Sequence, residues 1–163
     1  MKIKIKEVGL ESIDEIISMR MEVLGEVFKS DFEKMSYEEK KNLTEENRIY
    51  YERELKSGGH IACFVYMNEE EVLVGCGGIC LYNEMPSPDN KNGKCGYLMN
   101  IYVREQYRKL GIGEQITNWL INAAKNKGVS KIFLESSVVA KHMYTKIGFV
   151  DMKDYMILKK NNP

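Results

Sequence analysis

Residues 97–113 read Tyr-Leu-Met-Asn-Ile-Tyr-Val-Arg-Glu-Gln-Tyr-Arg-Lys-Leu-Gly-Ile-Gly, and this stretch decides the fold. Its first seven residues are typical of a strand, and a strongly amphipathic segment begins at the two glycines. The apolar residues of that segment recur at helical spacing: Ile112, Ile116, Trp119, Leu120 and Ala123. The sequence therefore predicts a strand, a short loop and a helix that begins at Gly111 to Gly113.

The start of this helix has the chemistry of an anion site. The first turn of a helix leaves backbone amides without an acceptor. Because Gly111 and Gly113 lack a Cβ, the oxygens of a ligand can approach this backbone, and the helix dipole favours their negative charge. Arg108 and Lys109 add positive charge. The pattern thus indicates a phosphate or pyrophosphate site. It is not a P-loop, because GxxxxGK[ST] is absent, nor a dinucleotide fingerprint, because the third glycine would fall at Ile116.

A second informative stretch, residues 140–149, reads Ala-Lys-His-Met-Tyr-Thr-Lys-Ile-Gly-Phe. It predicts a short helix over residues 139–146 that carries Tyr144 and ends at Gly148-Phe149. A phenol, with a reference pKa of about 10, can give a proton to a departing thiolate, whose reference pKa is about 8.5. The alternative for Tyr144 is an ordinary half-buried aromatic.

Together, the two stretches resemble the GNAT superfamily of acetyl-CoA-dependent N-acetyltransferases. Residues 108–113 match the family element [Q/R]-x-x-G-x-[G/A], and residues 140–149 match A-x-x-x-Y-x-x-x-G-F. The motifs cover about residues 97–150, whereas the first half of the chain agrees only in the order of its elements. Ser137 stands where family members often carry an asparagine that contacts CoA.

The resemblance implies a role for each matched position, with acetyl-CoA as the co-substrate. The amides around Arg108 to Glu114 hold the pyrophosphate, and residues 101–103 pair with the pantetheine arm like another strand. An amide near Ile101 or Tyr102 polarises the acetyl carbonyl, and Tyr144 acts as general acid beside the sulfur. The implied cofactor-binding residues are Ile101, Tyr102, Val103, Arg108, Lys109, Leu110, Gly111, Ile112, Gly113, Glu114, Ser137 and Tyr144.

The acceptor side has fewer signals in the sequence. Arg20 falls on the apolar stripe of a helix predicted over residues 9–29, where its guanidinium either reaches water or contacts an anion. The resemblance places the first two helices in one wall of the acceptor cleft, so an anionic group on the acceptor is expected at Arg20. Asn100 and Glu84 are the other candidate substrate residues. Strand alternation predicts that Asn100 points to the opposite face from Met99 and Ile101.

The group that removes the proton of the acceptor amine is left open among several residues. A base must accept a proton near neutral pH, which for a glutamate requires a raised pKa. For Glu135, near the end of its strand, a solvated or salt-bridged side chain is the favoured alternative to a base. The candidates are Glu84, Glu135, and Asn100 or Tyr102 acting through water.

The order of the elements predicts a mixed α/β fold. Strands are expected over residues 2–6, 61–67, 72–82, 96–104, 131–136 and 155–159, and helices over 9–29, 36–56, from 111, and over 139–146. This order fits a GNAT-like, mostly antiparallel, twisted central sheet with one parallel pair at the cofactor cleft and about four flanking helices. The length of 163 residues fits a single domain, 1–163.

Composition narrows the class of partner. Lys plus Arg and Asp plus Glu both number 24, so the formal net charge is zero, which argues against nucleic-acid binding. No apolar run approaches the roughly 20 residues that cross a bilayer, so no membrane association is expected. The four cysteines form no CxxC pair and are read as reduced thiols in a cytoplasmic protein. With His60 and His142 as the only histidines, no metal is expected.

These observations predict an N-acetyltransferase that transfers the acetyl group of acetyl-CoA to a primary amine of a small molecule or peptide, by direct attack on the thioester. A non-catalytic acyl-CoA-binding or sensor module of the same fold is the alternative. A third reading is nucleotide-phosphate binding through Gly111 and Gly113. Exposed strand edges would also permit a homodimer.

Overall fold

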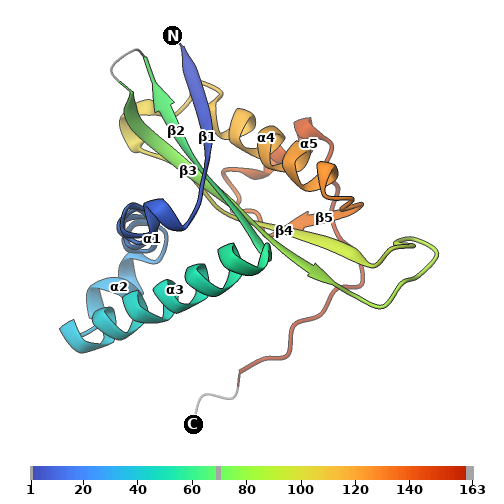
Figure 1. Cartoon of the computed structure of the whole chain (residues 1–163), viewed down its shortest axis with the longest axis horizontal. Helices are drawn as coiled ribbons and strands as arrows, with labels where there is room; N and C mark the ends of the chain where they lie inside the picture. Colours follow the sequence, from blue (N-terminus) through green and yellow to red (C-terminus); the bar gives the residue numbers. More distant parts are fainter. Residues whose placement is uncertain (1, 69–70, 161–163) are drawn as a thin grey trace.

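The computed structural model describes residues 2–68 and 71–160. One five-stranded sheet, in the order β1-β2-β3-β4-β5, runs through it (Figure 1). Its first four strands are antiparallel neighbours, and the last pairs parallel with the fourth. The strands are β1 (Ile3–Val8), β2 (His60–Met67), β3 (Val72–Asn83), β4 (Lys94–Val103) and β5 (Lys131–Leu134). This confirms the predicted mixed sheet with one parallel pair.

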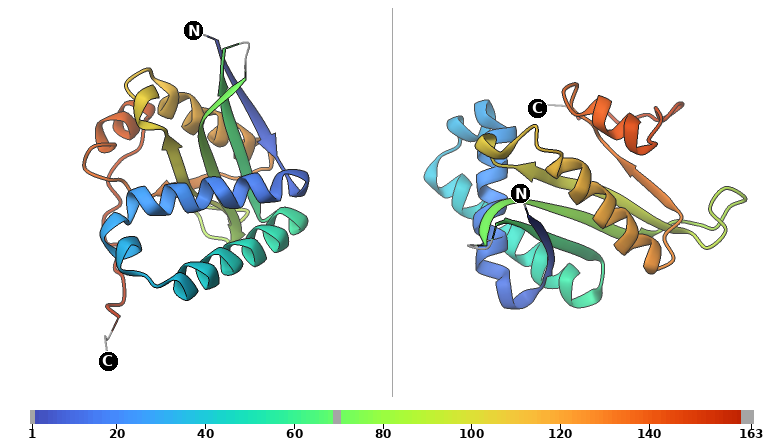
Figure 2. Two further views of the ribbon diagram at one scale, coloured as in Figure 1. Left: turned by 90° about the vertical axis from the view of Figure 1, so that its left-hand side faces the viewer. Right: turned by 90° about the horizontal axis from the view of Figure 1, so that it is seen from above.

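Helices cover both faces of the sheet. One group lies on one face and a second group on the other (Figure 2). The first group is α1 (Ile13–Val27), α2 (Lys29–Lys34) and α3 (Tyr37–Ser57), and the second is α4 (Ile112–Asn126) and α5 (Lys141–Ile147). Short 3-10 turns span Leu10–Ser12 and Glu105–Tyr107. Among the described residues, no helix has the length and apolar character of a membrane span.

Strand β2 is almost continuously apolar because both of its faces are covered. Ile61 and Val65 join the core beneath α4, whereas Ala62 and Phe64 join the core beneath α1 and α3. The alternation follows from the period of two in a strand. The sheet therefore separates two hydrophobic cores, one on each side.

The glycines of β3 allow other atoms to approach closely. A Cβ on Gly77 would overlap Cγ2 of Ile116 in α4, and one on Gly75 would lie 2.5 Å from the carbonyl oxygen of Tyr102. The pairing of β3 with β4 also shifts register between Cys76 and Gly78. Glycine in this strand thus lets α4 pack tightly and accommodates a bulge.

The helical part of the N-terminal half is confirmed with one difference. Ser36 begins α3 with a capping box to Glu39, and Gly58 ends it with a φ of +77°. The helix expected over residues 9–29 is instead a 3-10 turn, α1 and the separate short α2. The break falls at Phe28, whose φ of −109° and ψ of +37° do not continue a helix.

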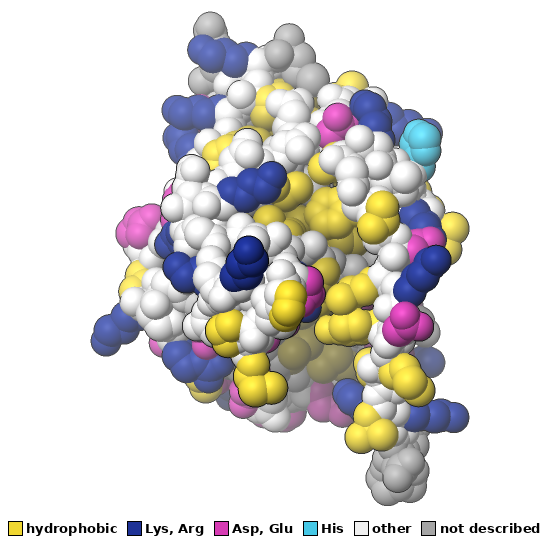
Figure 3. Space-filling model, turned by 90° about the vertical axis from the view of Figure 1, so that its right-hand side faces the viewer, with side chains coloured by type: hydrophobic (Ala, Val, Ile, Leu, Met, Phe, Trp, Pro, Cys, Tyr) yellow, Lys and Arg dark blue, Asp and Glu magenta, His cyan; other side chains and the backbone are white. Residues whose placement is uncertain are grey.

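The strand expected over residues 155–159 does not form, and this prediction is wrong. The chain turns at Asp154, where φ is +63°, and then runs away from the sheet (Figure 1). Met156, Ile157 and Leu158 consequently remain about nine-tenths exposed. A hollow lined by β5, by α5 and by residues 148–152 lies beside this segment, and Figure 3 shows apolar side chains in it.

Candidate active site

Strand β4 and the edge strand β5 separate partway along β4. Pairing with β5 extends only from Cys95 to Leu98, opposite residues 131–134. Beyond Leu98, β4 continues to Val103 while its pairing with β5 has ended. The backbone edge of residues 99–103 therefore faces an opening rather than a neighbouring strand.

A bulge in β4 redirects the side chains at this opening. The register shift against β3 falls here, and Asn100 has a φ of +59°. Met99 and Asn100 both line a pocket on the side of α3, while Ile101 lines a pocket on the side of α4. The expectation that Asn100 and Met99 point to opposite faces is therefore wrong, because the bulge interrupts strand alternation.

The turn before α4 presents unbonded amides. Helix α4 begins at Ile112 with Gly111 as its N-cap, as the sequence predicts, and both Lys109 and Gly111 have a positive φ. Within the described residues, the backbone amides from Lys109 to Glu114 donate to no protein acceptor. The turn borders a pocket of about 300 Å³. Such a run of free donors at a helix start is suited to phosphate oxygens.

The side chain of Arg108 connects this turn to α1. Its guanidinium forms an ion pair with Glu26, and its Nε donates a hydrogen bond of 2.8 Å to the carbonyl oxygen of Val103. The hydrogen bond from Arg108 holds the pKa of the Glu26 carboxyl below its usual value. Part of the positive charge that the sequence places at the turn is thus compensated by Glu26, while Lys109 stays exposed.

Tyr144 also lines this pocket. Its side chain is 8% exposed, and its ring packs edge-on against Phe149 with the centroids 5.8 Å apart. Burial raises the pKa of the phenol, so Tyr144 stays protonated at neutral pH. The two sequence motifs, far apart along the chain, therefore meet across one pocket.

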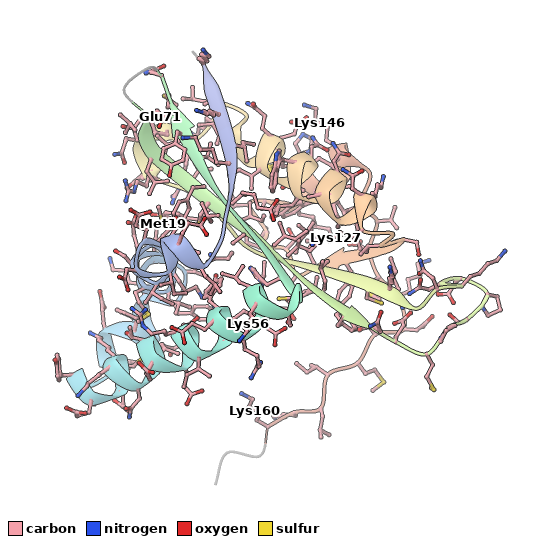
Figure 4. The ribbon with its side chains drawn as sticks, in the orientation of Figure 1. Met19, Lys56, Glu71, Lys127, Lys146 and Lys160 are labelled. Atoms are coloured by element: carbon pink, nitrogen blue, oxygen red, sulfur yellow. The ribbon has the colours of Figure 1, made fainter. Side chains whose placement is uncertain are left out.

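Helix α5 is held in place against α4. Lys146, labelled in Figure 4, pairs with Glu114 at 3.0 Å. A Cβ added to Gly113 of α4 would lie 3.2 Å from the sulfur of Met143 in α5. Ser137 is exposed before α5, and its Oγ accepts a hydrogen bond from the amide of Ala140. Ser137 does not line the pocket of Tyr144.

The candidates for the base differ in whether they line a pocket at the β4 bulge. Glu84 pairs with Lys131 at 3.0 Å, and hydrogen bonds from Asn90 and Lys131 hold its pKa below the usual value. Glu84 lines neither pocket at the β4 bulge. Glu135 is exposed just after β5.

Two other candidates lie on β4 itself. The phenol of Tyr102 donates a hydrogen bond of 2.6 Å to Glu26, and burial raises its pKa. Its side chain lies in the core beneath α1. Asn100 is the candidate whose side chain lines a pocket at the bulge.

A second pocket, of about 220 Å³, lies on the α3 side of the bulge. We call it the Arg20 pocket, and its lining residues are Arg20, Asn47, Tyr50, Tyr51, His60, Cys80, Met99 and Asn100. Sequence reasoning singled out Arg20 and Asn100, but it assigned no binding role to Tyr50, Tyr51, His60 or Cys80. These residues come from separate elements, so no spacing along the chain signals the pocket.

His60 is the most unusual residue of the Arg20 pocket. It is 4% exposed, and its Nδ1 lies 2.9 Å from the phenol oxygen of Tyr50. Its Nε2 has no hydrogen-bond partner among the described residues. Burial lowers the pKa of His60 to about 4, so the imidazole is neutral at pH 7.

Comparison with known proteins agrees with this geometry. A predicted acetyltransferase of Clostridium acetobutylicum, solved with acetyl-CoA, superposes with a TM-score of 0.81 at 22% identity, over 97% of this chain and 96% of that one. A GCN5-related N-acetyltransferase of Ralstonia eutropha JMP134 gives 0.77 at 15% identity, over 97% and 99%. At these identities the likeness concerns the fold.

A sequence relative and a family model complete the comparison. The chain is 36% identical over 63 residues to the uncharacterized N-acetyltransferase YobR of Bacillus subtilis (strain 168), a match that spans 37% of this chain and 26% of that protein. The model of the acetyltransferase (GNAT) family matches residues 22–149, which include the amide turn and Tyr144. The chain belongs to the GNAT acetyltransferase family.

Proposed function

We propose that this chain transfers the acetyl group of acetyl-CoA to a primary amine of a small molecule or peptide. The observation that carries the proposal is the run of unbonded amides from Lys109 to Glu114, which borders the pocket that Tyr144 also lines. A diphosphate beside this turn would satisfy donors that otherwise depend on water. Membership of the GNAT family supports acyl transfer from a CoA thioester.

The backbone groups around the opening are suited to the phosphates and the pantetheine arm of CoA. The position of Gly111 leaves open space where a side chain would otherwise stand, so phosphate oxygens can reach the amides. The free edge of residues 101–103 offers backbone groups to the amides of the pantetheine arm, as another strand would. Acetyl-CoA supplies the activated acyl group, and no protein nucleophile is required.

The proposed reaction is a direct displacement. The amine nitrogen bonds to the thioester carbonyl carbon, the C–S bond breaks, and the sulfur receives the phenolic proton of Tyr144. The proton lost by the amine returns through water to the phenolate, so that the products are an N-acetyl amide and CoA. A backbone amide near Ile101 would stabilise the developing oxyanion.

A direct test combines binding with turnover. Calorimetry should detect acetyl-CoA binding, and release of free thiol should follow when acetyl-CoA is mixed with a panel of primary amines. Absence of acetyl-CoA binding contradicts the proposal. Competition by ATP at the same concentration as acetyl-CoA would favour the nucleotide reading.

The non-catalytic module is the second candidate function, and Tyr144 distinguishes it from the enzyme. A pure acyl-CoA sensor gains nothing from a protonated phenol beside the sulfur, so the buried Tyr144 favours catalysis. Binding of acetyl-CoA without thiol release for any amine in the panel would support the sensor.

A homodimer is also part of the proposal. The exposed Met156, Ile157 and Leu158 follow one another in the segment that runs away from the sheet after Asp154. Burial of such side chains against a second copy would remove apolar surface from water. Light scattering on the purified chain should give twice the chain mass, and a monomer at micromolar concentration would contradict this. We further place the protein in the cytoplasm, where its four free thiols would stay reduced.

A further inference from the structure

The Arg20 pocket contains an arginine that differs from all the others in this chain. The sequence has five arginines, and four of them form ion pairs with carboxylates: Arg48, Arg53, Arg104 and Arg108. Arg20 has no carboxylate partner among the residues that the structure describes. It is also the one arginine of the five that lines this pocket.

Neutral groups fix the position of the Arg20 guanidinium. Its Nε donates to Oδ1 of Asn47 at 3.2 Å, and its Nη1 donates to Oδ1 of Asn100 at 2.9 Å. Asn47 is itself anchored, because its Nδ2 donates to the carbonyl oxygen of Leu43 at 2.8 Å. Both N–H groups of Nη2 remain without an acceptor in the described part of the chain. A guanidinium that is held in place and has free donors is suited to an oxyanion.

The rest of the lining does not compensate the charge on Arg20. The pocket contains two tyrosines, a methionine, a thiol and two side-chain amides, and none of them is acidic. His60 is neutral, since burial lowers its pKa to about 4. The charge on Glu54, which does not line the pocket, raises this pKa, and the charge on Arg20 lowers it, but burial has the largest effect. Arg20 itself is only partly exposed. A partly desolvated cation without a counter-ion is costly, and a bound anion would remove that cost.

Size and position restrict the ligand further. The volume of about 220 Å³ lies below the roughly 300–1,000 Å³ of sites for drug-sized ligands. Asn100, which lines this pocket, is followed directly by Ile101, which lines the pocket of Tyr144. A small ligand held by Arg20 therefore lies next to the point where β4 separates the two pockets.

We propose that the acceptor is a small amine that also carries a carboxylate, the size of an α-amino acid, with its carboxylate on Arg20 and its amine directed to the β4 bulge. This inference rests on the proposed acetyl transfer. The absence of acidic side chains in the pocket also predicts that polyamines, which carry only positive charge, are poor acceptors.

The test compares matched acceptors. Thiol release from acetyl-CoA is measured with the standard α-amino acids, with the carboxamide of each one, and with spermidine. The same measurements are made on Arg20→Gln, on Arg20→Lys, and on the control Arg48→Gln, whose arginine pairs with Asp14 outside the pocket. Thermal melting of each variant verifies that it is folded.

We expect at least one amino acid to exceed its carboxamide in kcat/KM by about tenfold to a hundredfold, the range of a charge-assisted hydrogen bond. Arg20→Gln should abolish this preference, Arg20→Lys should restore part of it, and Arg48→Gln should retain it. Equal use of acid and carboxamide overturns the inference. So does acetyl-CoA binding by calorimetry with no amino acid acetylated, and in that case the proposed function remains. If acetyl-CoA does not bind at all, both fail.

Discussion

The two pockets at the β4 bulge are built in different ways. The pocket on the α4 side relies on main-chain amides from one contiguous turn, residues 109–114, together with one tyrosine. The Arg20 pocket relies on side chains from α1, α3 and three strands. Any sequence that forms the turn supplies its backbone donors, whereas a pocket of assembled side chains depends on which residues stand at distant positions. The amide turn is therefore readable in the sequence as one motif, whereas of the Arg20 pocket the sequence indicates only Arg20 and Asn100.

The largest effect on activity should come from Tyr144, the side chain that lines the α4-side pocket together with the backbone amides of residues 109–114. Tyr144→Phe removes the proton donor, so kcat should fall about a hundredfold or more while the Kd for acetyl-CoA stays within about twofold. Thiol-release assays and calorimetry measure the two quantities. Tyr66→Phe, on β2 and in neither pocket, is the matched control. An unchanged kcat in Tyr144→Phe would remove its role as the acid.

The dependence of kcat on pH is a second test of Tyr144 as the acid. Burial raises the pKa of Tyr144 above its ordinary value of 10. The protonated form is the active one, so the activity due to Tyr144 should be present throughout neutral pH and be lost only as the pH rises through that elevated pKa. A loss of kcat centred well below pH 10 that disappears in Tyr144→Phe would contradict this assignment.

The next effect concerns the affinity for acetyl-CoA that we expect from the backbone amides of residues 109–114. Gly111 and Gly58 have nearly equal φ values, +75° and +77°, and both have open space where a Cβ would stand. Valine at either position should cost about 1–2 kcal/mol of unfolding free energy, because L-residues are strained there. Only Gly111→Val should also weaken acetyl-CoA binding, by about a hundredfold, since its side chain obstructs the amides. Equal acetyl-CoA affinity in the two variants would refute the amide turn as the pyrophosphate site.

His60 provides a stability test of the Arg20 pocket. Its pKa is lowered from 6.5 to about 4, so the unfolded chain binds a proton between these values and the folded chain does not. The folded state is therefore not destabilised by His60 above pH 6.5. As the pH falls below that value, protonation of His60 in the unfolded chain lowers the free energy of unfolding, by about 2 kcal/mol at about pH 5. Urea unfolding against pH in His60→Gln should lack this loss, while the exposed His142→Gln should keep it. Identical profiles for all three proteins would show that His60 is not buried in its neutral form.

The smallest effect concerns two ion pairs that join α1 to the end of β4 and to the turn before α4. Glu22 pairs with Arg104 and Glu26 with Arg108, and these arginines lower the pKa of both carboxyls. A lowered carboxyl pKa stabilises the fold above the unfolded value near 4.5, and the stabilisation is lost as the pH falls through the folded value. Because these carboxylates are more than one-third exposed, we expect less than about 1 kcal/mol from each pair. The double variant Glu22→Gln/Glu26→Gln should therefore unfold in urea with a flatter pH dependence below about pH 4.5.

Local signals were sufficient for most of the framework. The glycines at positions 111 and 113, the amphipathic pattern after them and the capping residue Ser36 act within a few residues of where they stand. Their outcomes agree with the structure because helix starts and ends depend on local backbone conformation. The strand expected over residues 155–159 is different, since a strand requires a neighbour to pair with, and its apolar pattern cannot supply one.

The sequence by itself determined most of the order of the elements, the mixed sheet with one parallel pair, and the two motifs whose residues line the α4-side pocket. Only the tertiary structure decided that Asn100 shares a face with Met99, that Arg108 is compensated by Glu26, and that Arg20 lacks an acidic partner among the described residues. The physical reason is the separation along the chain of the residues that interact. Helix caps and amphipathic periods are set by neighbours along the chain, whereas bulges, ion pairs and pocket walls depend on residues that folding brings together from distant positions.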